Sequence, residues 1–150
     1  MQTSFDEIEG QFSPDGRWLA YASNEAGRYE IYVQSFPESG GKARISTAGG
    51  VQPRWGREGR ELLYVAPDNR LMAVPIHLAS DARTVEAGAP LALFPTRLAS
   101  AGANIAAAGF GARAQYAVAR DGRLLMNIAV DDAVTSPITI VQHWDAALKK

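Results

Sequence analysis

Three acidic residues, each followed by glycine and arginine, are the first candidates for chemistry in this chain of 150 residues: Asp15, Glu58 and Asp121. Carboxylates of this kind can bind metal ions or transfer protons. A calcium loop of the EF-hand type, however, needs acidic residues at alternating positions and a distal glutamate, and none of the three sites has them. We therefore expect turn carboxylates that accept hydrogen bonds from backbone N–H groups.

The two histidines, His77 and His143, do not form a recognisable metal motif. Zinc takes three or four nitrogen, sulfur or oxygen ligands, and the chain has no cysteine and no His-x-x-x-His or His-Glu-x-x-His spacing. We expect both to be surface or core-rim histidines. Asp131 and Asp132 are expected in a solvated hairpin turn.

Motifs for nucleophilic catalysis and nucleotide binding are also missing. The sequence contains no Gly-x-Ser-x-Gly elbow, P-loop or Gly-x-Gly-x-x-Gly. The glycine pairs Gly40-Gly41 and Gly49-Gly50 are interpreted as turns that link strands, and Gly109-Phe110-Gly111 as a loop. We predict no catalytic, cofactor-binding or metal-binding residue.

Composition indicates one globular domain and narrows the range of partners. Lys and Arg number 15 and Asp and Glu 16, for a net charge of −1, so the basic stripe of a nucleic-acid-binding protein is missing. No apolar run approaches the roughly 18 residues of a transmembrane helix. The first residues lack the apolar core of a signal peptide, which leaves the compartment open.

The acidic positions belong to a longer repeat. Residues 12–21, F-S-P-D-G-R-W-L-A-Y, return as W-G-R-E-G-R-E-L-L-Y at residues 55–64 and as V-A-R-D-G-R-L-L-M-N at residues 118–127. The copies are 43 and 63 residues apart, and the longer interval includes a stretch rich in Ala, Gly and Ser at residues 98–113. We interpret that stretch as an inserted surface loop. Repetition with a period of about 40–50 residues is typical of β-propellers and other repeat arrays.

The pattern within each copy predicts short antiparallel strands. Pro14 and Gly16 favour a tight turn over residues 13–17, because proline cannot donate a ladder hydrogen bond and glycine tolerates positive φ. The predicted strands cover residues 18–22, 29–36, 42–46, 51–55, 61–66, 70–77, 85–94, 115–119, 124–130 and 138–144. Four strands per unit of about 43 residues correspond to one propeller blade. The expected fold is all-β, with three four-stranded blades at residues 6–47, 48–97 and 114–150.

Six aromatic residues recur at related positions of the repeats. They are Trp18, Tyr21, Tyr29, Tyr32, Trp55 and Tyr64. Recurrence of this kind favours packing between blades, and the alternative is a ring of aromatics at a channel mouth that stacks on a sugar or peptide.

The segment F-S-P-D-G-R-W-L-A-Y-A-S-N-E, followed by E-I-Y-V-Q-S-F-P, resembles the TolB-type β-propeller repeat, a bacterial relative of the WD repeat. W-G-R-E-G-R-E-L-L-Y-V-A-P-D-N-R-L-M-A-V-P-I is similar to the propeller that follows the transmembrane segment of many bacterial serine/threonine kinases. The resemblance covers most of the chain outside residues 98–113. It implies a periplasmic or extracytoplasmic location, but the kinase motifs are absent from this chain.

Three blades are too few to close a propeller ring, which has four to eight. Residues 1–5 are expected as an unpaired outer strand, whereas the last copy lacks a fourth strand. Two interpretations follow: a homodimer in which two chains complete a six-bladed ring, or a fragment of a longer propeller.

The sequence thus predicts a module that binds a protein, peptide or small ligand without catalysis, as the sensing or interaction part of a bacterial envelope signalling protein. The alternative is an enzyme, a glycan lyase or hydrolase, acting at the channel mouth. That alternative needs converging ionisable side chains. Its candidates are Arg54, Arg57 and His77.

Overall fold

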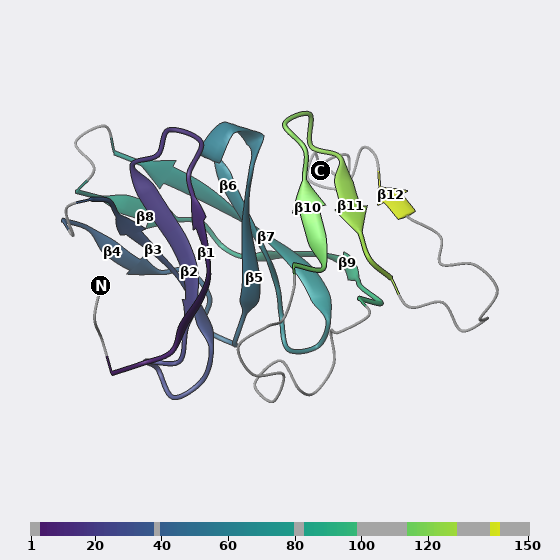
Figure 1. Ribbon diagram of the computed structural model, residues 1–150, viewed down its shortest axis with the longest axis horizontal. Coiled ribbons are helices and arrows are strands. Elements are labelled where there is room, and N and C mark those ends of the chain that lie inside the picture. Colours follow the sequence, from purple (N-terminus) through teal and green to yellow (C-terminus); the bar gives the residue numbers. More distant parts are fainter. Residues whose placement is uncertain (1–3, 38–39, 80–82, 99–113, 129–138, 142–150) are drawn as a thin grey trace.

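The structure is a computed structural model, and it describes residues 4–37, 40–79, 83–98, 114–128 and 139–141. These residues form an all-β fold of three antiparallel sheets, each built from a consecutive stretch of chain (Figure 1). The helical content of the described residues is one 3-10 segment, η1 (Arg57–Gly59). The all-β prediction is therefore confirmed.

The first sheet contains β1 (Glu7–Phe12), β2 (Trp18–Ser23), β3 (Glu30–Ser35) and β4 (Lys42–Arg44) in that order. The turn between β1 and β2 is closed by Ser13, whose N–H donates to Trp18 O at 2.8 Å, and it uses a positive φ of 72° at Gly16. The expected strand at residues 1–5 is wrong where it can be checked. Ser4 and Phe5 form a bend, and residues 1–3 lie outside the described residues.

The second sheet contains five strands: β5 (Val51–Gly56), β6 (Glu61–Val65), β7 (Arg70–Leu78), β8 (Val85–Ala87) and β9 (Leu91–Pro95). The single strand predicted at residues 85–94 is two strands, and both of them pair with β7. The break falls at residues 88–90, Gly-Ala-Pro, because proline at position 90 lacks the N–H that a continuous ladder requires.

The third sheet contains β10 (Tyr116–Val118), β11 (Leu124–Met126) and β12 (Thr139–Val141). Leu98, expected at the start of an inserted loop, instead forms a β-bridge with Ile128 and is 4% exposed. The rest of that expected loop, residues 99–113, lies outside the described residues.

Pairing in the third sheet differs by one residue from pairing in the first. In the repeat alignment, Leu124 corresponds to Trp18 and Val118 to Phe12. Phe12 pairs with Leu19, whereas Val118 pairs with Leu124 itself. Since side chains alternate between the two faces of a strand, this shift turns the aligned residues of β11 to the other face.

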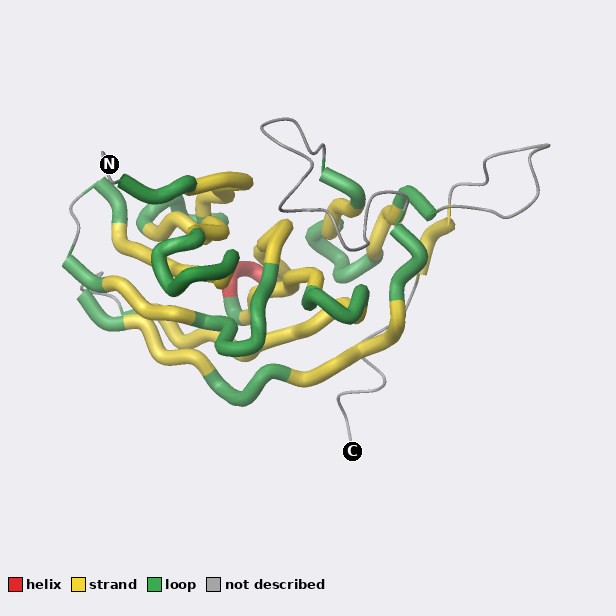
Figure 2. The backbone as a smooth tube through the Cα atoms, turned by 90° about the horizontal axis from the view of Figure 1, so that it is seen from below, coloured by secondary structure: helices red, strands yellow, loops and turns green. Residues whose placement is uncertain are grey.

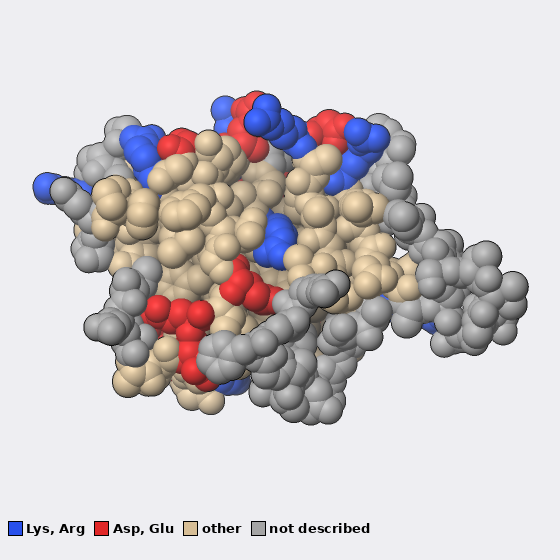
Figure 3. Space-filling model, viewed as in Figure 1, with Lys and Arg blue, Asp and Glu red and all other residues tan. Residues whose placement is uncertain are grey.

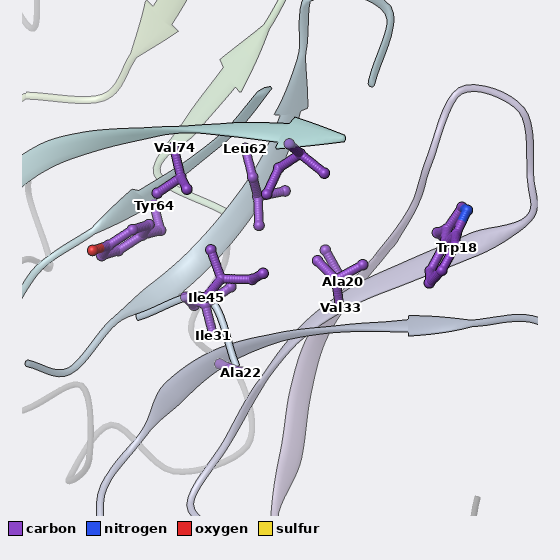
Figure 4. Packing of buried hydrophobic residues seen from close by; sticks show 10 residues of the cluster. Trp18, Ala20, Ala22, Ile31, Val33, Ile45, Leu62, Tyr64 and Val74 are labelled. Carbon is purple, nitrogen blue, oxygen red and sulfur yellow. The ribbon is translucent and has the colours of Figure 1, made fainter. Parts of the chain in front are cut away.

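The second sheet is covered on both faces, and this packing forms the core. One face of β6 and β7 meets the first sheet in a cluster that Figure 4 shows from close by, with side chains of the two sheets pointing toward one another. The buried members of that cluster are Trp18, Ala20, Ala22, Ile31, Val33, Ile45, Leu62, Tyr64, Val74 and Ile76. The alternate residues of the same strands, among them Leu63, Val65 and Leu71, meet Tyr116, Leu124 and Met126 of the third sheet.

Four of the six recurring aromatic residues take part in the core between the first and second sheets. Trp18 and Tyr64 are buried between the first and second sheets, and Tyr29 and Trp55 pack against them. Tyr21 and Tyr32, by contrast, stack on each other at 5.8 Å on the opposite face of the first sheet. Neither residue belongs to the two core clusters that the described residues form between sheets, because Tyr21 and Tyr32 lie at strand positions whose side chains point away from the second sheet.

Truncating a leucine in the core between the first two sheets tests this packing. Leu62→Ala, at a fully buried position, should lower the free energy of unfolding by about 2–5 kcal/mol, since it leaves a cavity between two sheets. Leu91→Ala, on β9 and 43% exposed, is the matched control and should change it by less than about 0.5 kcal/mol. Chemical denaturation measures both, and equal losses would contradict the assigned core.

Candidate functional site

The first strands of the three sheets, β1, β5 and β10, lie side by side on one face of the molecule, with β5 in the middle (Figure 1). We call this the inner-strand face. In the same orientation, Figure 3 shows a basic patch and an acidic patch meeting over the middle of a face made mostly of other residues. This face is the candidate site, because three copies of the repeat bring equivalent residues together there.

A row of side-chain-to-backbone hydrogen bonds joins the three inner strands. The Gln52 N–H donates to Glu9 Oε2 at 2.6 Å, and the Gln115 N–H donates to Gln52 Oε1 at 3.0 Å. In each case a side chain of one repeat accepts from the equivalent backbone N–H of the next. Glu9, Gln52 and Gln115 form what we call the inner-strand row.

Backbone geometry directs the side chains of this row toward the neighbouring sheet. Glu9 and Gln52 have φ values of 58° and 55°, and each lies at a register shift in the pairing of its strand. A positive φ is unfavourable for residues other than glycine, by about 1–2 kcal/mol. A bulge changes the direction in which a side chain points. Here the hydrogen bond to the next sheet offsets the cost of the positive φ.

The row carries one buried acid. Burial raises the pKa of Glu9, although the Gln52 N–H and the charge of Arg54 act to lower it. Its second oxygen, Oε1, is buried and has no hydrogen-bond partner among the described residues. Burial therefore couples the ionisation of Glu9 to folding.

Arg54 and Tyr116 complete the polar contacts of the inner-strand face. The Tyr116 hydroxyl donates to Gln52 O at 2.7 Å, and its burial raises the pKa of the phenol. The Arg54 guanidinium carbon lies 5.7 Å from the centre of the Tyr116 ring, and Nη1 donates to Pro53 O at 2.6 Å. The cation is thus held over an aromatic ring, an arrangement that contributes about 0.5–1 kcal/mol at exposed sites.

A groove of about 630 Å³ opens at the end of the inner strands next to the turns of the repeats. Its lining combines aromatic and aliphatic side chains with a few polar ones, a mixture typical of ligand sites. The lining residues are Gln11, Phe12, Pro14, Arg54, Trp55, Gly56, Glu58, Ala117, Val118, Ala119 and Arg120. Trp55 also fixes the wall of the groove, since its Nε1–H donates to Gln11 O at 3.0 Å.

Two of the three acidic residues of the repeats stabilise the turns in which they lie. Asp15 accepts from the Arg17 N–H at 3.1 Å and pairs with the Arg17 Nε at 2.9 Å. Asp121 repeats both contacts with Arg123, at 3.1 and 2.7 Å. Glu58 differs: it lies in η1 with a φ of 56°, and it accepts no hydrogen bond among the described residues. The expected shared geometry therefore holds for the two aspartates and fails for Glu58.

The glycine pairs expected to link strands do so. The N–H groups of Gly40 and Gly41 donate to Ser35 Oγ between β3 and β4. Gly49 and Gly50 join β4 to β5, and the Gly49 N–H donates to the buried carboxylate of Glu30 at 2.9 Å. Gly109-Phe110-Gly111 lies outside the described residues.

The residues named for the catalytic alternative do not come together. His77 is exposed on β7, opposite Glu86 of β8. Arg54 lies level with Ala73, two strands away from β7, so strand spacing and rise place the His77 and Arg54 backbones about 16 Å apart. The Arg57 side chain, His143, Asp131 and Asp132 lie outside what the structure describes.

Within the described part of the chain, no three acidic or histidine side chains are grouped closely enough to hold a metal ion. The same residues contain no helix long and apolar enough to cross a membrane. Comparison of the chain with models of known protein families gives no match, and comparison with the curated proteins gives none either.

The inner-strand row was missed by reasoning from sequence, although a signal for it exists. Glu9, Gln52 and Gln115 each lie six residues before an acid–glycine pair, so the row has the same spacing of 43 and 63 residues as the repeat. A polar residue recurring at one repeat position indicates a shared role, and the structure identifies that role as contact between sheets.

The raised pKa of Glu9 predicts how the stability of the fold changes with pH. Its folded pKa lies above the unfolded value, so the carboxylate weakens the fold increasingly as pH rises above about 4.5. Glu9→Gln should therefore gain stability relative to the native chain between pH 4 and pH 7. Urea unfolding across this range measures the difference, and a flat or falling difference would contradict it.

Asp121 serves as a control, because the pKa shift of its carboxyl group has the opposite direction to that of Glu9. The hydrogen bond from the Arg123 N–H holds the pKa of Asp121 below its usual value, so its contribution is present at neutral pH and lost as pH falls. Asp121→Asn should consequently be more harmful at pH 7 than at pH 3.

Proposed function

We propose that this chain is a non-catalytic binding module, built as part of a β-propeller of the TolB type, with its ligand site in the groove of the inner-strand face. The observation that carries the proposal is the alignment of β1, β5 and β10 by a hydrogen bond that recurs from one repeat to the next. In a propeller the innermost strand of each blade lines the central channel. The inner-strand face would then be one wall of that channel.

The chemistry of the groove favours recognition over reaction. Phe12, Trp55 and Val118 offer apolar contact, and Gln11 and Arg54 add polar side chains to the lining. A protein segment, a peptide or a small polar ligand fits such a lining. The separation of Arg54 from His77 leaves the alternative of a glycan lyase or hydrolase with little support.

The wider role follows from the sequence resemblance. A propeller module next to a bacterial membrane kinase would act as the sensing or interaction part of an envelope signalling protein, in a periplasmic or extracytoplasmic location. The near-neutral charge of the chain makes nucleic acid a poor partner for it.

Obstruction of the groove tests the proposal. Peptides selected from a displayed random library, and glycans on an array, are the probes. Ala119 lines the groove and is exposed, so Ala119→Arg should weaken binding of the selected ligand at least about tenfold. Ala92→Arg, at an exposed alanine of the edge strand β9, should leave affinity unchanged within about twofold. Ligands that bind both variants equally well would contradict the groove as the site.

A further inference from the structure

The turn of the second repeat lacks the ion pair that the turns of the other two contain. In the first and third repeats, the acidic residue pairs with the arginine two residues later, at 2.9 and 2.7 Å. Glu58 and Arg60 occupy the same repeat positions, yet neither forms an ion pair with any residue that the structure describes. Both side chains are exposed, so two charges that the other repeats use within the turn remain available to a ligand.

Backbone geometry accounts for this difference. Glu58 has a φ of 56° and lies in η1, whereas the aspartates of the other two turns do not have a positive φ. With this backbone, the Glu58 carboxylate does not accept from the N–H two residues later, as both aspartates do. A positive φ at a residue other than glycine is unfavourable, and such residues cluster at functional sites. The departure from the repeat is therefore built into the backbone of this turn.

A second groove of about 630 Å³ adjoins the first one at this turn. Glu58 and Arg120 line both grooves, whereas Arg54 lines the first and Arg60 the second. Figure 2, in which η1 is red, shows this turn between the first and third sheets, and Figure 3 shows charged side chains of both signs along the edge where the repeat turns lie. The grooves therefore form one elongated site with Arg120 at its middle, which we call the two-groove site.

Positive charge predominates in the two-groove site. Arg54, Arg60 and Arg120 line it, and none of them forms an ion pair within the described part of the chain. Among the described residues, the Arg54 side chain donates one hydrogen bond, to a backbone oxygen, so other N–H groups of its guanidinium can serve a ligand. Glu58 is exposed, whereas Glu61 is only 6% exposed. Three cations against one exposed carboxylate favour a ligand that carries negative charge.

We propose that the two-groove site binds an extended peptide segment of a partner protein in which an acidic residue lies between apolar ones. The acidic side chain would pair with Arg120, and the apolar side chains before and after it would occupy the two grooves. This inference deepens the proposed function and rests on it, because it assigns the chemical class of the ligand that the groove of the inner-strand face takes.

The lining of the two grooves supports a peptide over other anionic ligands. The first groove offers the apolar side chains of Trp55 and Val118, and the second offers those of Pro75 and Leu91. An extended peptide can place an acidic side chain between apolar ones along one chain. An anionic glycan instead carries hydroxyl groups on every unit, and these would lie against the apolar walls without hydrogen-bond partners.

Glu58 opposes the charge of the proposed ligand. Its carboxylate lines both grooves together with Arg120, so it lowers the positive potential there and repels an acidic peptide. Removal of the Glu58 charge should therefore strengthen the binding of acidic peptides, whereas removal of the Arg120 charge should weaken it. A basic ligand would respond to the same two substitutions in the opposite directions.

Peptide selection tests the charge of the ligand. The probe is a displayed nonapeptide library of apolar and small residues whose central position is randomised among Asp, Glu, Gln and Lys. Selection on the full chain should enrich peptides with an acidic centre. For the best binder, fluorescence polarisation should give a dissociation constant at least about tenfold lower with Glu at the centre than with Gln, because a charge-assisted hydrogen bond is gained. Enrichment of Lys at the centre would overturn the inference.

Three glutamine substitutions locate the interaction. Arg120→Gln should weaken binding of the Glu-centred peptide at least about tenfold and leave its Gln-centred counterpart within about twofold, a contrast that loss of stability does not produce. Glu58→Gln should strengthen binding of the Glu-centred peptide about twofold or more. The matched control is Arg44→Gln, at an exposed arginine of β4 that lines neither groove, and it should leave affinity unchanged. Equal effects of Arg120→Gln and Arg44→Gln, or weaker binding after Glu58→Gln, would overturn the inference.

These outcomes are separate from that of the groove test. If Ala119→Arg blocks the selected peptides but their central residue has no effect on affinity, the acidic-peptide inference fails and the binding role stands. If polygalacturonate, an anionic glycan, binds the native chain and no peptide does, the peptide assignment alone is refuted. Absence of binding by every probe would refute both the inference and the binding role.

Discussion

Burial of both faces of the second sheet is the interaction on which the rest of the structure depends. Strands β6 and β7 alternate so that successive residues, such as Leu62 and Leu63, enter different cores and are both fully buried. A fully buried leucine contributes about 1.5–3 kcal/mol relative to an exposed one. The first and third sheets are thus held through the middle sheet, and the inner-strand face exists because all three are stacked in this order.

Much of this arrangement could be predicted from local sequence. The Asp15-Gly16 and Asp121-Gly122 turns follow from glycine at positive φ and from an aspartate that accepts the N–H of the arginine two residues later. The strands around them follow from alternating apolar residues. The limits of such reasoning appear at residues 85–94, where a proline divides one expected strand, and at Glu58, where the turn has a different form.

Contacts between sheets were harder to predict, because they depend on register. Trp18 and Leu124 align in sequence, yet a one-residue shift in pairing means that they face opposite neighbours: Trp18 packs toward the following sheet and Leu124 toward the preceding one. The same limit applies to Tyr21 and Tyr32, whose recurrence suggested contact between repeats. The candidate site was missed for a related reason. The Glu9 and Gln52 side chains reach the next sheet because their strands bulge, and the residue types at these positions do not predict a bulge.

The direction of the inner-strand row has a consequence for the order in which the molecule is made. Every acceptor side chain precedes its donor in the chain: Glu9 before Gln52, and Gln52 before Gln115. During synthesis, the acceptor side chain of each pair therefore leaves the ribosome before its donor. The two contacts of the row can form in chain order, the one between Glu9 and Gln52 before the one between Gln52 and Gln115.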